Sequence, residues 1–135
     1  MPFVMDAQRE ELIVSTFLAE LTPVAIYLHG SVLSSRIHDE SDIDLALLFR
    51  HGAGIDSFAL SRLSVDLEVA LGLPPHIGIL SFDSLLYSAE VVAGGEKIYE
   101  SDSYYCDFFA MTVLSMYADF NETRRDIFSS YLRDF

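Results

Sequence analysis

The 135-residue sequence has little cysteine and no long hydrophobic run. Its one cysteine, Cys106, excludes a disulfide framework within the chain and a zinc site built from several cysteines. This usage predicts a reducing compartment, most simply the cytoplasm. No apolar run reaches the about 20 residues that a transmembrane helix needs, and the first residues lack the basic segment and cleavage site of a signal peptide. We therefore expect a cytoplasmic protein with no membrane partner.

Basic residues are also scarce. Eight lysines and arginines stand against 21 aspartates and glutamates, which gives a net charge of −13. Binding to nucleic acid requires concentrated lysines and arginines to neutralise the phosphates, and here they are scattered from Arg9 to Arg133. We therefore expect no nucleic-acid partner. A small phosphate-bearing ligand is still compatible with this composition if a metal ion supplies the positive charge.

No linker rich in proline, glycine or serine divides the chain, so we expect one domain over residues 1–135. A hydrophobic fraction of 51% excludes a disordered chain. The alternation of helical and extended patterns predicts an α/β (α+β) fold with a small mixed sheet of three or four strands packed by helices. Helices are expected over 7–21, 57–71, 84–94 and from 103 onward with a break or bend near Asn121, capped by Asp6, Asp83 and Asp102 and, at the end of the second, by Gly72. Strands are expected over 24–28, 42–49 and 76–81, with a short extended piece at 98–99.

The chemically informative segment is Gly30-Ser31, followed after ten residues by Asp42-Ile43-Asp44 at the start of a predicted strand. Residues two apart on a strand point to the same face about 6.5 Å apart, so both carboxylates can share Mg²⁺ through oxygen ligands. The intervening Ile43, with Leu45 and Leu47, is expected to face the opposite way into the core. Gly30 permits a sharp turn and close approach of a ligand, and Ser31 offers a hydroxyl and a backbone N–H to an anion. With a metal between phosphate and carboxylates, the arrangement favours phosphoryl-transfer chemistry.

Gly-Ser, ten residues and Asp-x-Asp are similar to the signature of the DNA polymerase β-like nucleotidyltransferases, and Ser41-Asp42-Ile43-Asp44-Leu45 resembles the minimal members of that superfamily. Residues 72–80 and 91–100 resemble further parts of that superfamily. Residues 117–125 and Tyr131 resemble the final helix of the MntA antitoxins, which pair with a HEPN-domain toxin. The resemblance implies the nucleotidyltransferase fold with a long C-terminal helix. It also implies the transfer of AMP from ATP, with Mg²⁺, to a tyrosine of a HEPN-domain RNase toxin, which neutralises the toxin.

The same resemblance implies a role for each motif position. Gly30 and Ser31 would hold the nucleotide phosphates, Ser31, Asp42 and Asp44 would form the catalytic set, and both aspartates would bind Mg²⁺. His76 stands where many relatives carry a third carboxylate, which helps to deprotonate the attacking hydroxyl and to bind a second metal. An imidazole can accept a proton but is a poorer Mg²⁺ ligand. Ser34-Ser35 stands where many relatives carry Arg-Gly, which removes one cation from the phosphate side.

Three other functions stay open at this point. An antitoxin or scaffold that only binds its partner would keep the fold and lose turnover through His76. A nucleotidyltransferase acting on small molecules would need a larger acceptor domain than the residues after Tyr99 provide. A phosphatase of the Asp-x-Asp type would carry its carboxylates after an apolar strand, whereas here the apolar run follows them.

The C-terminal region is rich in aromatic residues, more than one face of a helix needs. They cover the small sheet, or one face binds a partner, either a HEPN-domain protein or a second copy; the tyrosines also allow self-modification. The aromatic residues of this region are Tyr104, Tyr105, Phe108, Phe109, Tyr117, Phe120, Phe128, Tyr131 and Phe135.

Two further residues are given structural roles. His29 is expected to pack or hydrogen-bond within its strand, and Cys106 is expected to pack as a small apolar side chain.

Overall fold

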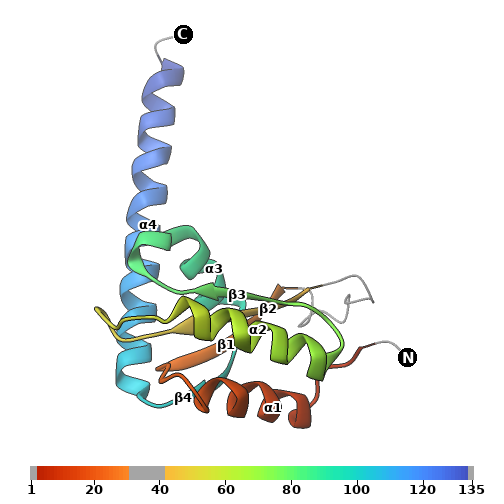
Figure 1. The fold of residues 1–135 in the computed structure, drawn as a ribbon. Helices are drawn as coiled ribbons and strands as arrows, with labels where there is room; N and C mark the ends of the chain where they lie inside the picture. Colours follow the sequence, from red (N-terminus) through yellow and green to blue (C-terminus); the bar gives the residue numbers. More distant parts are fainter. Residues whose placement is uncertain (1–2, 31–41, 134–135) are drawn as a thin grey trace.

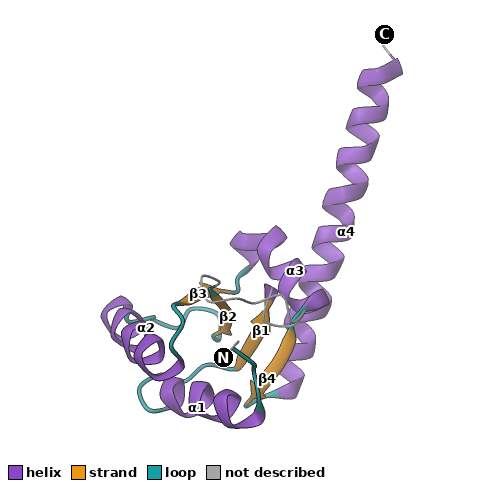
Figure 2. Ribbon diagram, turned by 90° about the vertical axis from the view of Figure 1, so that its right-hand side faces the viewer, coloured by secondary structure: helices purple, strands orange, loops and turns teal. Residues whose placement is uncertain are grey.

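The fold is a four-stranded sheet between two layers of helices (Figures 1 and 2). We describe residues 3–30 and 42–133 of a computed structural model. Along the chain the elements are α1 (Ala7–Leu18), β1 (Ala25–His29), β2 (Ile43–Leu48), α2 (Ser57–Leu71), β3 (Pro75–Ile79), the 3₁₀ turn η2 (Phe82–Ser84), α3 (Leu85–Gly94), β4 (Glu96–Glu100) and α4 (Ser103–Arg133).

The sheet is mixed, as the sequence predicts. Its strand order is β3-β2-β1-β4. The strand β1 is antiparallel to both β2 and β4, whereas β2 and β3 run parallel. Helices α1 and α2 cover one face, and α3 and α4 cover the other (Figure 2). The central strands β1 and β2 are therefore covered on both sides, which explains their apolar composition.

The alternation of side chains along β2 divides the core into two layers. Ile43, Leu45 and Leu47 are fully buried under α1 and α2, which confirms the predicted core face of this strand. Ala46 and Leu48 point to the opposite face and are buried under α3 and α4. Asp44 alternates with the core-facing residues in the same way as Ala46 and Leu48, and Asp42 lies just before the strand. The α3/α4 face is therefore apolar in its middle and polar at the end where β2 begins.

Most of the predicted helix ends are confirmed. The Asp6 carboxylate accepts a hydrogen bond from the backbone N–H of Arg9 at 2.8 Å, although α1 ends at Leu18, before the predicted position. Asp102 accepts from the N–H of Tyr105 at 3.0 Å and so caps α4. Gly72 ends α2 in the left-handed conformation, at φ 82°, that favours glycine.

The predicted cap at Asp83 is wrong. This residue lies inside η2, and the hydroxyl of Ser81 accepts the N–H of Ser84 in its place. The short turn intervenes between β3 and α3, so α3 begins at Leu85 without a side-chain cap. The serine two residues earlier is an equally good cap by composition, and the pattern alone does not separate the two.

Helix α4 runs without interruption past Asn121, so the predicted break is wrong. No glycine or proline stands there to interrupt its hydrogen bonds. Its first half packs on the sheet through Cys106, Phe109 and Val113, all buried, whereas its second half extends beyond the other elements (Figures 1 and 2). The aromatic residues therefore divide between the core and an exposed helix end.

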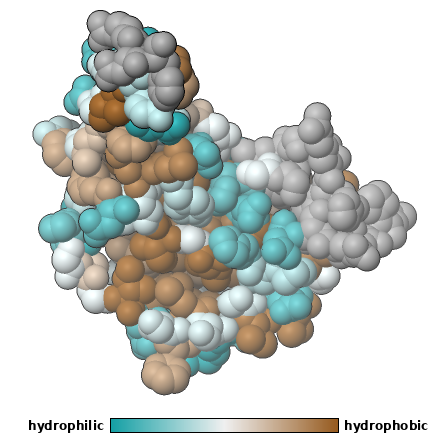
Figure 3. Space-filling model, turned by 90° about the horizontal axis from the view of Figure 1, so that it is seen from above, coloured by the Kyte–Doolittle hydropathy of each residue, from teal (hydrophilic) through white to brown (hydrophobic). Residues whose placement is uncertain are grey.

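The projecting end of α4 carries large apolar side chains in water. Seen from above, apolar surface appears on this end of the helix and on the face below it (Figure 3). No helix in the described ranges, α4 included, has a stretch apolar enough to cross a lipid bilayer. The exposed apolar side chains of the projecting end are Phe120, Ile127, Phe128, Tyr131 and Leu132.

Candidate functional site

Three polar residues lie side by side across the sheet at the polar end of its α3/α4 face. His29 on β1 is paired with Asp44 on β2, and Asp44 is paired with His76 on β3. These three residues are termed the polar row. Asp42 lies immediately before β2 and is exposed. The backbone N–H of Ile43, between the two aspartates, donates to the carbonyl of the residue before β3 at 3.0 Å and fixes the start of the strand.

Gly30, which directly follows β1, lies against Asp44 of β2. A Cβ atom placed on Gly30 would lie 2.3 Å from Oδ2 of Asp44, and Gly30 has a positive φ of 78°. Only glycine satisfies both the conformation and the close approach. The structure therefore brings the glycine of the Gly-Ser pair against the second aspartate. Ser31 lies outside the described residues, as do Ser34 and Ser35.

Asp44 and His76 approach one another without a hydrogen bond. The Nδ1 atom of His76 lies 3.8 Å from Oδ1 of Asp44, which is too long for a hydrogen bond. The side chain of Asp44 is 30% exposed and that of His76 is 65% exposed. Both groups are thus open to solvent on the same face, with a gap between their facing atoms.

His29 is engaged on its other side. Its Nε2 atom lies 3.0 Å from the hydroxyl oxygen of Tyr87, which comes from α3, and the two rings meet edge to face. Burial lowers the pKa of His29, while the charge of Asp44 acts in the opposite direction. Burial also raises the pKa of Tyr87, with a further contribution from Asp44. The expectation that His29 is hydrogen-bonded is confirmed, and its partner is a tyrosine that sequence analysis missed.

Tyr87 reaches His29 because β3 contains Gly78. A Cβ atom at Gly78 would lie 2.0 Å from the hydroxyl oxygen of Tyr87, so the tyrosine ring crosses the strand where there is no side chain. A glycine inside an apolar strand indicates this kind of close approach, and it was the available signal in the sequence. Tyr87 therefore forms one wall beside the polar row.

The carboxylates fit a metal ion that is shared with a phosphate ligand. Within residues 3–30 and 42–133, no three His, Cys, Asp or Glu side chains converge closely enough to hold a metal alone. Carboxylate oxygens are nevertheless the donors that Mg²⁺ prefers, and Mg²⁺ is usually held by one or two carboxylates together with substrate phosphates. Asp42 and Asp44 would supply this part of the coordination.

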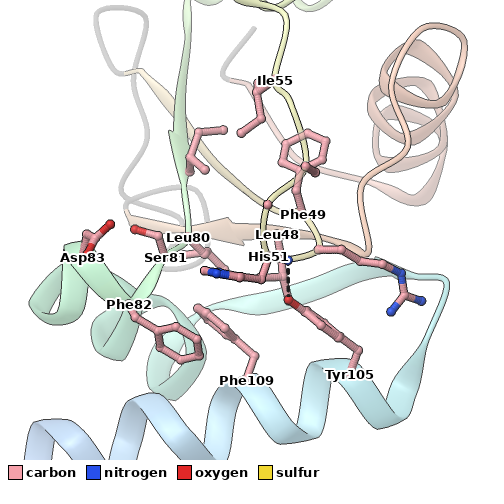
Figure 4. Close-up of a pocket in the computed structure, with 14 residues that line it drawn as sticks. Leu48, Phe49, His51, Ile55, Leu80, Ser81, Phe82, Asp83, Tyr105 and Phe109 are labelled. Atoms are coloured by element: carbon pink, nitrogen blue, oxygen red, sulfur yellow. Dashed lines mark hydrogen bonds between the residues drawn. The ribbon is translucent and has the colours of Figure 1, made fainter.

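A cavity of about 200 Å³ lies elsewhere in the molecule, at the opposite end of β2 from Asp44 (Figure 4). Leu48, Phe82 and Phe109 line it, and the backbone N–H of His51 donates to the hydroxyl of Tyr105 at 2.8 Å beside it. None of the residues predicted for the site lines this cavity. The polar row lies instead at the other end of β2, where the side chains of Asp44 and His76 are 30% and 65% exposed among the described residues.

Comparison with known families gives one match, which contains the polar row. Residues 11–104 match the family model described as polymerase beta, nucleotidyltransferase. The matched segment includes Gly30-Ser31, Asp42, Asp44 and His76. Among curated proteins, no significant match to the chain is found.

Solved structures similar to this chain include toxin–antitoxin complexes. A chain of a toxin–antitoxin complex with AMP-PNP is 25% identical, with a TM-score of 0.73, and the match covers 91% of this chain and 98% of that chain. A chain of the complex of tri-AMPylated Shewanella oneidensis HEPN toxin with MNT antitoxin is also 25% identical, with a TM-score of 0.73 and coverage of 95% and 99%. A chain of the MntA–HepT complex, 22% identical with a TM-score of 0.70 and coverage of 94% and 99%, shares the fold.

Proposed function

Because this chain belongs to the polymerase β nucleotidyltransferase family, we propose that it is an antitoxin of the MNT type that transfers AMP from ATP to a tyrosine of a HEPN-domain toxin. The modification neutralises the toxin. Residues 1–135 act as one nucleotidyltransferase domain, and the reaction takes place in the cytoplasm, where ATP is available.

The observation that carries this proposal is the meeting of Gly30 with Asp44 at the polar end of the sheet. A glycine turn pressed against a carboxylate brings a phosphate-binding backbone next to a metal-binding oxygen. Asp42 and Asp44 would hold Mg²⁺, and Gly30 and Ser31 would hold the phosphates. When bound, the ion neutralises charge on the phosphates in the transition state.

In the proposed reaction the phenolic oxygen of the toxin's tyrosine forms a bond to the α-phosphorus of ATP. The bond from that phosphorus to the bridging oxygen of the β-phosphate breaks, and pyrophosphate leaves. The phenolic proton is lost to a nearby base or to water. Little covalent chemistry is asked of the protein, because positioning and charge neutralisation supply most of the catalysis of phosphoryl transfer.

Two features of this chain support a protein partner. An RNase toxin must carry basic residues to bind RNA phosphates, and a net charge of −13 on this chain attracts such a surface. Exposed apolar side chains on the projecting end of α4 are of the kind that protein interfaces bury, among them Phe120, Phe128 and Tyr131.

Intact mass of a co-expressed HEPN-domain partner tests the proposal. With the native chain we expect the partner to gain one or more AMP units and to lose RNase activity. With the double variant Asp42→Asn and Asp44→Asn we expect the unmodified mass and an active toxin. A partner that stays unmodified with the native chain would overturn the transferase assignment.

A binding-only antitoxin is the second candidate function. It is favoured by His76, because an imidazole stands opposite Asp44 where a carboxylate would bind Mg²⁺ more strongly. In this case the partner would be inhibited without any gain in mass, and the double aspartate variant would inhibit it equally well. The same mass measurement therefore separates the two functions.

A further inference from the structure

We infer that the cavity at the far end of β2 binds a guanidinium group, carried either by an arginine side chain or by a small guanidino compound. Phe82, Asp83, Tyr105 and Phe109 are among the residues that line this cavity. None of the described residues proposed for AMP transfer is among them. The inference is therefore independent of the proposed function and concerns a second site.

The size of the cavity fits a group of side-chain dimensions. Its volume is about 200 Å³. An apolar cavity of about 150 Å³ is enough to hold a benzene molecule, whereas sites for drug-sized ligands begin at about 300 Å³. A guanidinium group on a short alkyl chain lies between these limits.

Aromatic rings and a carboxylate form the walls of the cavity. The rings of Phe82 and Phe109 lie beside each other, with their centroids 5.2 Å apart, and Tyr105 lies one turn earlier on α4 (Figure 4). Asp83 lines the cavity directly after Phe82 in the sequence. Aromatic faces attract cations, and a planar guanidinium can stack on a ring while its N–H groups donate to a carboxylate. These walls therefore favour a guanidinium over a neutral or anionic group.

The carboxylate of Asp83 is available to such a ligand. The hydroxyl of Ser81 caps the turn η2, and Asp83 has no hydrogen bond or ion pair within residues 3–30 and 42–133. Arg50 also lines the cavity, but its positive charge is paired with Asp102 at 2.7 Å. The net charge of −13 adds a general attraction for cations.

The chain already holds one of its own guanidinium groups by this combination of ring and carboxylate. The Cζ atom of Arg50 lies 5.1 Å from the centroid of the Tyr105 ring, while its terminal nitrogen contacts Asp102. Phe82 and Asp83 offer the same two kinds of group inside the cavity, and no arginine among the described residues pairs with them. A guanidinium from outside the chain would therefore complete the arrangement.

Nuclear magnetic resonance of the ¹⁵N-labelled native chain tests the inference. The chain is titrated at constant ionic strength with ethylguanidinium and, separately, with ethylurea, which has the same planar shape without the charge. The titrations are run at pH 7.5, at which imidazole groups are largely neutral. We expect ethylguanidinium to shift the backbone amide signals of His51, Phe82 and Tyr105 in a saturable way. Ethylurea should bind at least about tenfold more weakly, because it lacks the charge that the rings and the carboxylate attract.

Substitutions in the walls locate the binding site. Asp83→Asn should weaken ethylguanidinium binding by about tenfold, because hydrogen bonds to a carboxylate are stronger than those to a neutral amide. Asp66→Asn is the matched control, since it makes the same change in charge at an exposed position on α2 away from the cavity, and it should keep the native affinity. Phe82→Leu keeps an apolar wall without the ring and should weaken binding by about three- to fivefold.

A blocked arginine, N-acetylarginine methylamide, distinguishes the two sources of the guanidinium. Binding at least as tight as that of ethylguanidinium assigns the cavity to an arginine of a protein partner. Weaker binding, or none, assigns it to a free guanidino compound.

Three results would overturn the inference. They are no saturable shifts at the cavity amides with ethylguanidinium, equal binding of ethylurea, and equal weakening by Asp83→Asn and Asp66→Asn. The first two are read on the native chain, so a variant that fails to fold does not prevent a decision. None of the three bears on AMP transfer, so the proposed function is judged by its own test.

Discussion

The two faces of β2 differ in what their side chains do. Toward α1 and α2, Ile43, Leu45 and Leu47 are fully buried and have purely apolar neighbours in the core. Toward α3 and α4, Asp42 precedes the strand, Asp44 lies near its start, and only the later residues Ala46 and Leu48 are buried and apolar. One face of this short strand is therefore fully buried, whereas the other face has a partly exposed carboxylate near its beginning.

The difference indicates that alternate residues of β2 serve different purposes. One set stabilises the fold, and the other set includes the residue proposed to act in the reaction. Side chains pointing to the α1/α2 face stabilise the sheet and do not reach the polar row. Asp44, which points to the polar end of the other face, is partly exposed and lies outside both apolar core clusters. Substitutions on the two faces should therefore affect different measurements.

The largest expected effect is on the chemical face. Asp44→Asn should lower the rate of AMP transfer by more than about a hundredfold, because a lost metal ligand removes several kcal/mol of transition-state stabilisation. The free energy of unfolding should change by less than about 1 kcal/mol, because this side chain is 30% exposed. Single-turnover labelling and urea denaturation measure the two quantities. The exposed Asp66→Asn on α2 is the matched control, and equal losses of transfer in both variants would contradict the separation.

On the core face, Leu47→Ala should lower the free energy of unfolding by about 2–5 kcal/mol, because Leu47 is fully buried and its removal leaves a cavity. Transfer per folded molecule should stay at the native level. Denaturant titration gives the first value, and activity corrected for the folded fraction gives the second. Val69→Ala, at an 81% exposed position on α2, should leave stability nearly unchanged. A full loss of activity in folded Leu47→Ala protein would show that the faces are coupled.

A smaller effect is expected where α3 crosses β3. Gly78→Ala should cost about 1–3 kcal/mol of unfolding free energy, because the added methyl group overlaps the ring of Tyr87 and forces it from His29. Thermal or urea unfolding reads this cost. Gly54→Ala is the control, since a Cβ there meets no atom within 4 Å. Equal stability of the two variants would contradict the close approach of the Tyr87 ring to Gly78.

The smallest effect is a pH dependence from His29. Burial lowers its pKa in the folded state below the unfolded value of 6.5, so the unfolded chain binds more protons between the two values. This contribution to stability is complete above pH 6.5 and is lost as the pH falls through 6.5 toward the folded pKa. His29→Gln should therefore show a weaker loss of stability from pH 7.5 to 5.5 than the native chain, in urea titrations at each pH. The control variant His51→Gln should keep the native dependence of stability on pH. A steeper loss of stability in His29→Gln than in the native chain would contradict the lowered pKa of His29.

The sequence was sufficient for the features that depend on local pattern. Period-two alternation placed Ile43, Leu45 and Leu47 in the core, and the capping residues Asp6 and Asp102 were placed correctly. Those features need only neighbours in sequence. The mixed sheet was also predicted, from the alternation of elements together with the family resemblance.

Other features could not be predicted because they depend on distant segments. His29 and Tyr87 are 58 residues apart, and their contact exists only because α3 folds back over Gly78. The exposure of Phe128 in α4 could not be predicted either. The sequence of α4 stays rich in apolar residues beyond the point where the helix leaves the sheet. The placement of Ser31 is still a prediction.

Calorimetric titration of ATP into the protein tests the central claim most directly, which is that Asp42 and Asp44 hold a metal-bound nucleotide at the polar end of the sheet. We predict binding in the presence of Mg²⁺ or Mn²⁺, none in the presence of a chelator, and none for Asp42→Asn with Asp44→Asn, whose unfolding free energy stays close to native. Binding of ATP that is unaffected by the chelator or by the double substitution would contradict the account.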